Sequence, residues 1–99
     1  MVKRILLLED DAALGQGIQL ALQLADAQIT LCSSLLQARQ LLSGAAFDLL
    51  ILDVNLPDGS GLELLREQKA LRPEIPAILL TANDLELDEV AGSMWTKTP

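Results

Sequence analysis

Short apolar runs alternate with amphipathic stretches along the 99-residue chain. Four runs are continuously apolar or rich in β-branched residues, which is typical of strands in a parallel sheet. The stretches between them repeat apolar residues every three or four positions, which indicates helices with one buried face. The pattern predicts strands over 4–10, 28–32, 48–53 and 76–82, and helices over 11–26, 33–44, 61–73 and 84–92.

This alternation also predicts the fold class. Strands that are linked through helices by short loops form a parallel sheet with helices on both faces. The chain is long enough for one such domain, and its 51% hydrophobic content can fill one core. We therefore expect a single α/β domain over 1–99 with a doubly wound parallel sheet. Asp10 or Asp11 is expected to cap the first helix, and the serines at 33–34 the second.

The rhythm breaks in the last stretch, 93–99, which reads as an irregular tail after a short helical segment. No further helix remains in the sequence to cover the sheet. We therefore expect the fifth strand and fifth helix of such a fold to be incomplete or missing. An apolar edge left uncovered favours association with a second copy, as a homodimer or a domain-swapped oligomer.

Charge and composition exclude several classes of protein. Seven basic and fourteen acidic residues give a net charge of −7, the wrong sign for binding nucleic acid. The chain has no histidine, which excludes Ser-His triads and His-containing zinc sites. Cys32 is the only cysteine, so no intrachain disulfide can form, and we expect it to be inert in the core. No stretch reads as a signal peptide or a membrane span, so we expect a cytoplasmic protein away from membranes.

Acidic residues end two of the predicted strands. Glu9 and Asp10 end the first strand, and Asp53 ends the third. These acids lie at one edge of a parallel sheet, where ligands bind, and their carboxylates converge if the first and third strands are neighbours. Asp10 could instead serve only as a helix cap. Two carboxylates roughly 4 Å apart repel by about 4 kcal/mol at an effective dielectric near 20, so such a cluster needs a proton or a cation. Hard oxygen ligands favour Mg²⁺.

A carboxylate beside Mg²⁺ can also act as a nucleophile and form an aspartyl phosphate. Asp53 is the best candidate for this role because it ends the predicted central strand. Thr81 and Lys97 are candidate contacts of the phosphoryl group, with a strand-end threonine and a solvated tail lysine as the alternatives. After Asp53, Pro57 restricts the backbone, and Gly59 and 61 allow a tight turn into the next helix.

Three motifs in order make residues 3–92 resemble the receiver domain of two-component response regulators. They are "ILLLEDD" at the first strand, "DLLILDVNLPDGSGLELL" at the third and "PAILLTA" at the fourth. The resemblance implies a flavodoxin-like sheet in the order 2-1-3-4-5. It also implies that Asp53 is the phosphoacceptor for a sensor histidine kinase. The output that such a domain switches would be transcription, through an attached output module.

The same resemblance assigns the other site residues. Glu9 and Asp10 match the acidic pair that binds Mg²⁺, and Asn55 matches the position whose backbone carbonyl completes the metal site. Thr81 matches the hydroxyl that moves toward the aspartyl phosphate. Lys97 is followed by Thr98 where the family has proline, and it lies nearer to Thr81 than in the family. This departure predicts a truncated or rearranged receiver.

Two other functions compete with a phosphorylated switch, which itself is not an enzyme in the ordinary sense. The first is a receiver-like module that binds or dimerises without phosphorylation, which the altered C-terminal segment favours. The second is a small hydrolase with an aspartate nucleophile. The hydrolase lacks the catalytic acid that it would need two residues after Asp53, where Asn55 stands.

Overall fold

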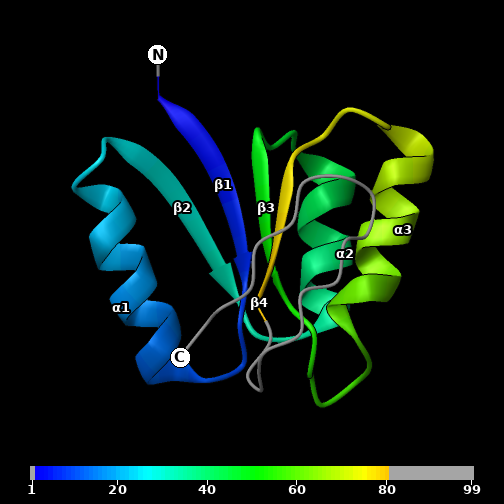
Figure 1. Cartoon of the computed structure of the whole chain (residues 1–99), viewed down its shortest axis with the longest axis horizontal. Coiled ribbons are helices and arrows are strands. Elements are labelled where there is room, and N and C mark those ends of the chain that lie inside the picture. Colours follow the sequence, from blue (N-terminus) through cyan, green and yellow to red (C-terminus); the bar gives the residue numbers. More distant parts are fainter. Residues whose placement is uncertain (1, 81–99) are drawn as a thin grey trace.

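The computed structural model describes residues 2–80, in which strands and helices alternate (Figure 1). The elements are β1 (Lys3–Leu8), α1 (Ala12–Gln23), β2 (Ala27–Cys32), α2 (Leu35–Gly44), β3 (Leu49–Asp53), α3 (Gly61–Leu71) and β4 (Ala77–Leu80). The strands pair in parallel in the order β2-β1-β3-β4, which confirms the predicted α/β class and that part of the order. The predicted helix 84–92, the tail 93–99 and any fifth strand or helix lie outside the described residues. Association through that edge stays a prediction.

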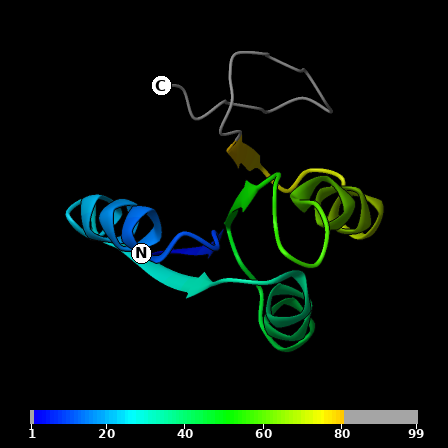
Figure 2. The same ribbon diagram turned by 90° about the horizontal axis from the view of Figure 1, so that it is seen from below.

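Within residues 2–80, the helices cover the two faces of the sheet unequally. Helix α1 lies on one face, and α2 and α3 lie side by side on the other (Figures 1 and 2). Side chains alternate between the faces along each strand, so neighbours in sequence enter different clusters. Leu6 and Leu50 pack in the larger cluster with residues of α2 and α3, whereas Ile5 and Ile51 pack in the smaller one with residues of α1.

The central strands are buried most deeply. In β1 and β3 the residues Leu6, Leu7, Leu8, Leu50 and Leu52 are fully buried. Strand β2 lies at the edge of the sheet, and most of its residues are only partly buried. The continuous apolar runs of β1 and β3 therefore mark the middle of the sheet. The acidic residues at the ends of these two runs are attached to the deeply buried central strands.

Caps fix where the helices begin. The side chains of Asp11, Ser34 and Ser60 accept backbone N–H groups of α1, α2 and α3 respectively. The predicted start at 33 is therefore wrong by two residues, because Ser34 has the extended backbone of a capping residue and the helix begins at Leu35. Asp11, and not Asp10, caps the first helix, which leaves the Asp10 carboxylate available to the site.

Several other predicted boundaries extend too far. The first strand ends at Leu8 and not at 10, because the chain leaves the sheet to bring Asp11 into its capping position. Helix α1 ends at Gln23 and not at 26, where Asp26 takes a left-handed conformation with a φ of 64°. Helix α3 ends at Leu71, two residues before Pro73, because proline disfavours helical backbone in the residue that precedes it.

Candidate metal centre

The acidic ends of β1 and β3 meet at one edge of the sheet. The two strands are neighbours in parallel register, with Leu8 opposite Leu52. Glu9, Asp10 and Asp53 follow or end these strands, and each offers a carboxylate oxygen within 4.8 Å of the others. This geometry confirms the predicted convergence of the three acids.

The three carboxylates differ in how they are held. The side chains of Glu9 and Asp53 are buried, with Glu9 only 3% and Asp53 only 4% exposed, whereas Asp10 is exposed. The Asp53 Oδ1 atom accepts the backbone N–H of Asn55 at 3.1 Å, and the Glu9 Oε2 atom accepts that of Asp11 at 3.2 Å. Two acids are thus fixed inside the protein, and the third faces solvent beside them.

Electrostatics make Asp53 the unusual member of the cluster. Burial, followed by hydrogen bonding to Glu9, raises the pKa of Asp53 from 3.8 to about 7, and the charge of Glu9 and a hydrogen bond to Asp10 act in the same direction. The N–H of Asn55 opposes this rise only in part. Ionisation of all three carboxylates therefore destabilises the folded protein, and a cation bound among them would offset their repulsion.

The donor set fits Mg²⁺. All three groups are carboxylates, which are the hard oxygen ligands that this ion prefers. The chain has no histidine, and Cys32 is not part of the cluster, so softer metals have little to bind. Burial raises the pKa of the Cys32 thiol to about 11, which keeps it protonated and unreactive at neutral pH. This agrees with its predicted place in the core.

A compact loop joins Asp53 to α3. The backbone N–H groups and carbonyls of Leu56 and Gly59 bond to each other at 3.0 and 3.3 Å, closing a turn with Pro57 at its second position. Gly59 has a φ of 147°, which disfavours any residue with a side chain. A Cβ atom on Gly61 would collide with the carbonyl oxygen of Asp53. Gly59 therefore serves the turn as predicted, whereas Gly61 is required by its close approach to the Asp53 backbone, which the sequence did not predict.

The predicted site residues thus fall into two groups. The structure brings Glu9, Asp10 and Asp53 together. It also places Asn55 beside Asp53, to which the Asn55 backbone N–H donates a hydrogen bond. The predicted role of the Asn55 carbonyl stays a prediction. Thr81 and Lys97 lie outside the described residues, so their predicted contacts with a phosphoryl group also stay predictions.

One residue near the site was missed by the sequence reasoning. The carboxylate of Asp58 accepts the backbone N–H groups of Leu35 and Leu36, which lie 23 and 22 positions earlier in the chain. The Pro-Asp-Gly sequence indicates a turn but says nothing about a distant partner. No pattern within the loop could have revealed this contact.

Comparison with known proteins identifies the family. The family model of the response regulator receiver domain matches residues 5–93, close to the range of 3–92 expected from the motifs. The chain belongs to the response regulator receiver domain family. This agrees with the parallel sheet order and with the acidic cluster at its edge.

Named relatives support this assignment. The swarming motility regulation protein RssB of Serratia marcescens is 44% identical over 81% of this chain and 36% of its own length. The response regulator PmrA of Pseudomonas aeruginosa is 43% identical over 90% of this chain and 40% of its own length. The chain therefore spans less than half the length of these relatives. Other relatives, such as BasR of Escherichia coli at 35% identity, are named transcriptional regulatory proteins.

Solved structures share the fold. The response regulator TrrA of Thermotoga maritima, in complex with Mg²⁺ and BeF, is 30% identical, with a TM-score of 0.79 over 84% of this chain and 72% of that one. A structure of the histidine kinase ThkA in complex with TrrA matches 98% of this chain and 87% of that one, with a TM-score of 0.86 and 26% identity.

Among residues 2–80, each helix is too short or too polar to cross a membrane.

Proposed function

We propose that this receiver domain accepts a phosphoryl group on Asp53 from a sensor histidine kinase and thereby switches an output. The observation that carries the proposal is the convergence of Asp53 with Glu9 and Asp10 at the carboxyl edge of the central strands. Ligands of open parallel sheets bind at this edge. A nucleophile and two further metal-ligating groups therefore share one place.

In this proposal each residue has a separate task. An Asp53 oxygen attacks the phosphorus of a phosphohistidine, the phosphorus–nitrogen bond breaks, and the released histidine nitrogen takes up a proton. Glu9, Asp10, Asp53 and the carbonyl of Asn55 would hold Mg²⁺. When bound, the ion supplies positive charge that offsets the phosphoryl oxygens. Thr81 and Lys97 would contact the same phosphoryl group.

Relatives support the partner and the output. The solved complex of ThkA with TrrA joins a histidine kinase to a protein that resembles this chain. TrrA, which shares this fold, has been solved in complex with Mg²⁺ and BeF. That complex supports the binding of Mg²⁺ and a phosphoryl group in the proposal. Because several relatives are transcriptional regulators, we infer that the switched output is transcription.

Phosphorylation with acetyl phosphate and Mg²⁺, followed by intact-mass measurement, tests the proposal. We expect the wild-type chain to gain one phosphoryl group only when Mg²⁺ is present, and Asp53→Asn to gain none. Asp26→Asn is a matched control, because Asp26 lies in the turn after α1 and asparagine tolerates its left-handed backbone. An unmodified wild-type chain, or equal modification of Asp53→Asn, would contradict the proposal.

A further inference from the structure

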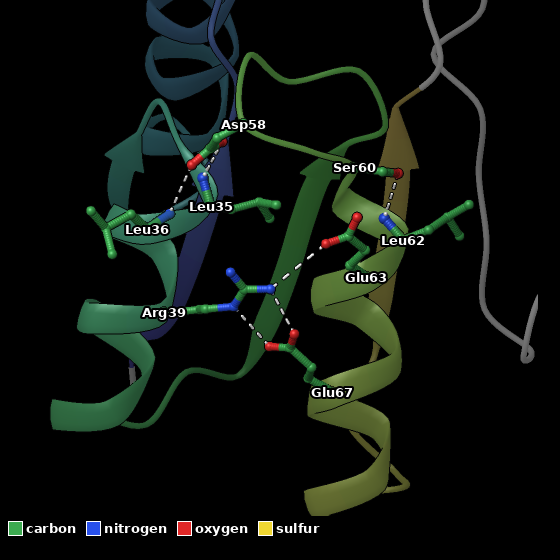
Figure 3. Close-up of polar contacts among 8 residues, drawn as sticks. All are labelled: Leu35, Leu36, Arg39, Asp58, Ser60, Leu62, Glu63 and Glu67. Carbon is green, nitrogen blue, oxygen red and sulfur yellow. Dashed lines mark hydrogen bonds and ion pairs between the residues drawn. The ribbon is translucent and has the colours of Figure 1, made fainter.

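The loop after Asp53 is attached to the N-terminus of α2 by one side chain. Asp58 Oδ1 accepts the N–H of Leu35 at 3.0 Å, and Oδ2 accepts the N–H of Leu36 at 3.3 Å (Figure 3). These are the first two residues of α2, whose N–H groups have no partner within the helix. The helix already has its own cap in Ser34, which accepts the N–H of Gln37 at 3.2 Å. Asp58 therefore adds a link between segments.

A second contact brings the same loop against the same helix. A Cβ atom on Gly59 would lie 2.6 Å from Cδ1 of Leu35, so the loop backbone packs directly on that side chain. Leu35 is itself only 1% exposed. The hydrogen bond to Asp58 and the apolar contact with Gly59 thus both involve Leu35, the first residue of α2. Together they hold the Asp58–Gly59 side of the turn against this helix.

Helix α2 is a firm support for this loop. Leu35 and Ala38 are buried in the larger core cluster. On the outer side, Arg39 donates to both carboxylate oxygens of Glu67 on α3, at 3.0 and 2.7 Å (Figure 3). The helix is therefore fixed to the sheet by its apolar face and to α3 by an ion pair.

The other side of the turn leads back to the acidic cluster. Leu56 closes the turn with Gly59, and Asn55 comes directly before Leu56. The N–H of Asn55 donates to Asp53, while the Asn55 side chain is exposed and forms no hydrogen bond within residues 2–80. The position of the Asn55 carbonyl thus depends on where the Leu56–Gly59 turn is held.

We propose that Asp58 is a positioning residue that holds the Asn55 segment at the acidic cluster by anchoring the turn to α2. The effect on the metal rests on the proposed function, because it assumes that the Asn55 carbonyl is a ligand of Mg²⁺. The effect on the loop does not, because the anchor consists of hydrogen bonds between residues of this chain alone. The two parts can be tested separately.

Amide hydrogen exchange of the metal-free chain tests the anchor. We expect Asp58→Ala to speed exchange at Asn55 and Leu56 at least about tenfold relative to Leu7 in the buried strand β1, which reports global unfolding. Ser34→Ala is the matched control, because it removes a cap of the same helix without touching the loop. Equal relative exchange in the two variants would show that Asp58 is only a helix cap and would overturn the proposal.

Titration with Mg²⁺, followed by calorimetry, tests the consequence for the metal site. Loss of groups that orient metal ligands typically lowers affinity by about 10- to 100-fold, and we expect Asp58→Ala to raise the Kd at least about tenfold. Ser34→Ala should leave the Kd unchanged. If the wild type binds Mg²⁺ and Asp58→Ala binds it equally well, the positioning role is refuted. If the wild type binds none, the proposed function fails, and hydrogen exchange still decides whether the anchor exists.

The conservative variant Asp58→Asn separates positioning from charge. Asparagine keeps one oxygen that can accept the N–H of Leu35, and it removes the negative charge. We expect its exchange at Asn55 and its Kd for Mg²⁺ to lie between those of the wild type and Asp58→Ala. A Kd equal to that of Asp58→Ala, with slow exchange at Asn55, would assign the effect to charge and contradict positioning.

Discussion

Asp53 and Asp58 lie five positions apart in one segment, yet their surroundings are opposite. Asp53 is buried beside Glu9, and burial together with that neighbour raises its pKa to about 7. Asp58 is exposed, and the N–H groups of Leu35 and Leu36 lower its pKa below the ordinary value. One carboxylate resists ionisation, and the other is stabilised as an anion.

The difference arises from the hydrogen-bond donors and charges around each carboxylate. Asp58 faces the positive end of a helix, so its charge strengthens the fold. Asp53 has one backbone donor and two acidic neighbours, so its charge is left for a ligand to compensate. Sites that act on ligands often retain such unfavourable groups, and the surrounding structure offsets their cost.

The largest effect should come from breaking the packing that holds Asp53. Gly61→Ala places a Cβ against the Asp53 carbonyl, and backbone cannot move aside easily. We expect a loss of about 2–3 kcal/mol in the free energy of unfolding, measured by urea denaturation with circular dichroism. Gly17→Ala is the control, because its Cβ would meet nothing within 4 Å, and it should gain about 0.5–1 kcal/mol. Equal results for the two variants would refute the close packing.

The next largest effect should come from removing the charge of Asp53. The folded protein binds a proton there more tightly than the unfolded chain, so this group lowers stability as the pH rises from about 4 to 7. In metal-free buffer, Asp53→Asn should therefore be more stable than the wild type above pH 7, by about 1–2 kcal/mol, because nearby water reduces the full effect. The gain should vanish near pH 4. Urea unfolding at both pH values measures it.

Mg²⁺ provides the control for this prediction. The ion should stabilise the wild type by mass action and Asp53→Asn much less, because the variant lacks one of the three carboxylates. The stability advantage of Asp53→Asn over the wild type would then shrink or reverse. An Asp53→Asn variant that is less stable than the wild type in metal-free buffer at pH 8 would show that the acids do not repel one another as inferred.

The sequence was sufficient for the fold and for the acidic cluster, for a specific reason. Alternating strands and helices restrict the topology to a parallel sheet, and strand ends meet at one edge. Glu9 and Asp53 could therefore be placed together although they are 44 positions apart. This inference also needed the first and third strands to be neighbours, which the strand order implied by the family resemblance supplies and the structure confirms.

Contacts between helices and loops could not be predicted in this way. The hydrogen bond from the Leu35 backbone N–H to the exposed Asp58 carboxylate spans 23 positions, and the pair between the exposed side chains of Arg39 and Glu67 spans 28. Charged residues on exposed surfaces have many possible partners, and periodicity does not select one. Leu71 shows the same limit, because it is an apolar residue of the amphipathic helix α3 and yet is 74% exposed.

A smaller effect should distinguish Asp58 from Asp53 by its dependence on pH. A lowered pKa in the folded state stabilises the protein above the ordinary value of 3.8, and this contribution is lost as the pH falls through the folded-state value. Asp58→Asn should therefore be less stable than the wild type at pH 7 and approach it at low pH. The sign at pH 7 is opposite to that of Asp53→Asn. Thermal unfolding of both variants from pH 7 to low pH measures these changes. If Asp58→Asn and Asp53→Asn changed stability in the same direction at pH 7, the contrast between the two carboxylates would be refuted.

The smallest effect should come from the ion pair between α2 and α3. Arg39 and Glu67 are exposed, and screened surface pairs contribute little to stability. Arg39→Ala should lower the thermal midpoint by less than about 3 °C, and about 1 M salt should remove most of that difference. The midpoint of the double variant with Glu67→Ala should lie close to that of Arg39→Ala, because that single variant already breaks the pair.

The same ion pair tests how far the metal site depends on the outer surface. Because α2 is held mainly by Leu35 and Ala38 in the core, Arg39→Ala should leave the Kd for Mg²⁺ unchanged, whereas Asp58→Ala raises it. A weaker Mg²⁺ affinity in Arg39→Ala would mean that the support for the loop extends through α2 to α3. An unchanged affinity would confine that support to Asp58 and the buried start of the helix.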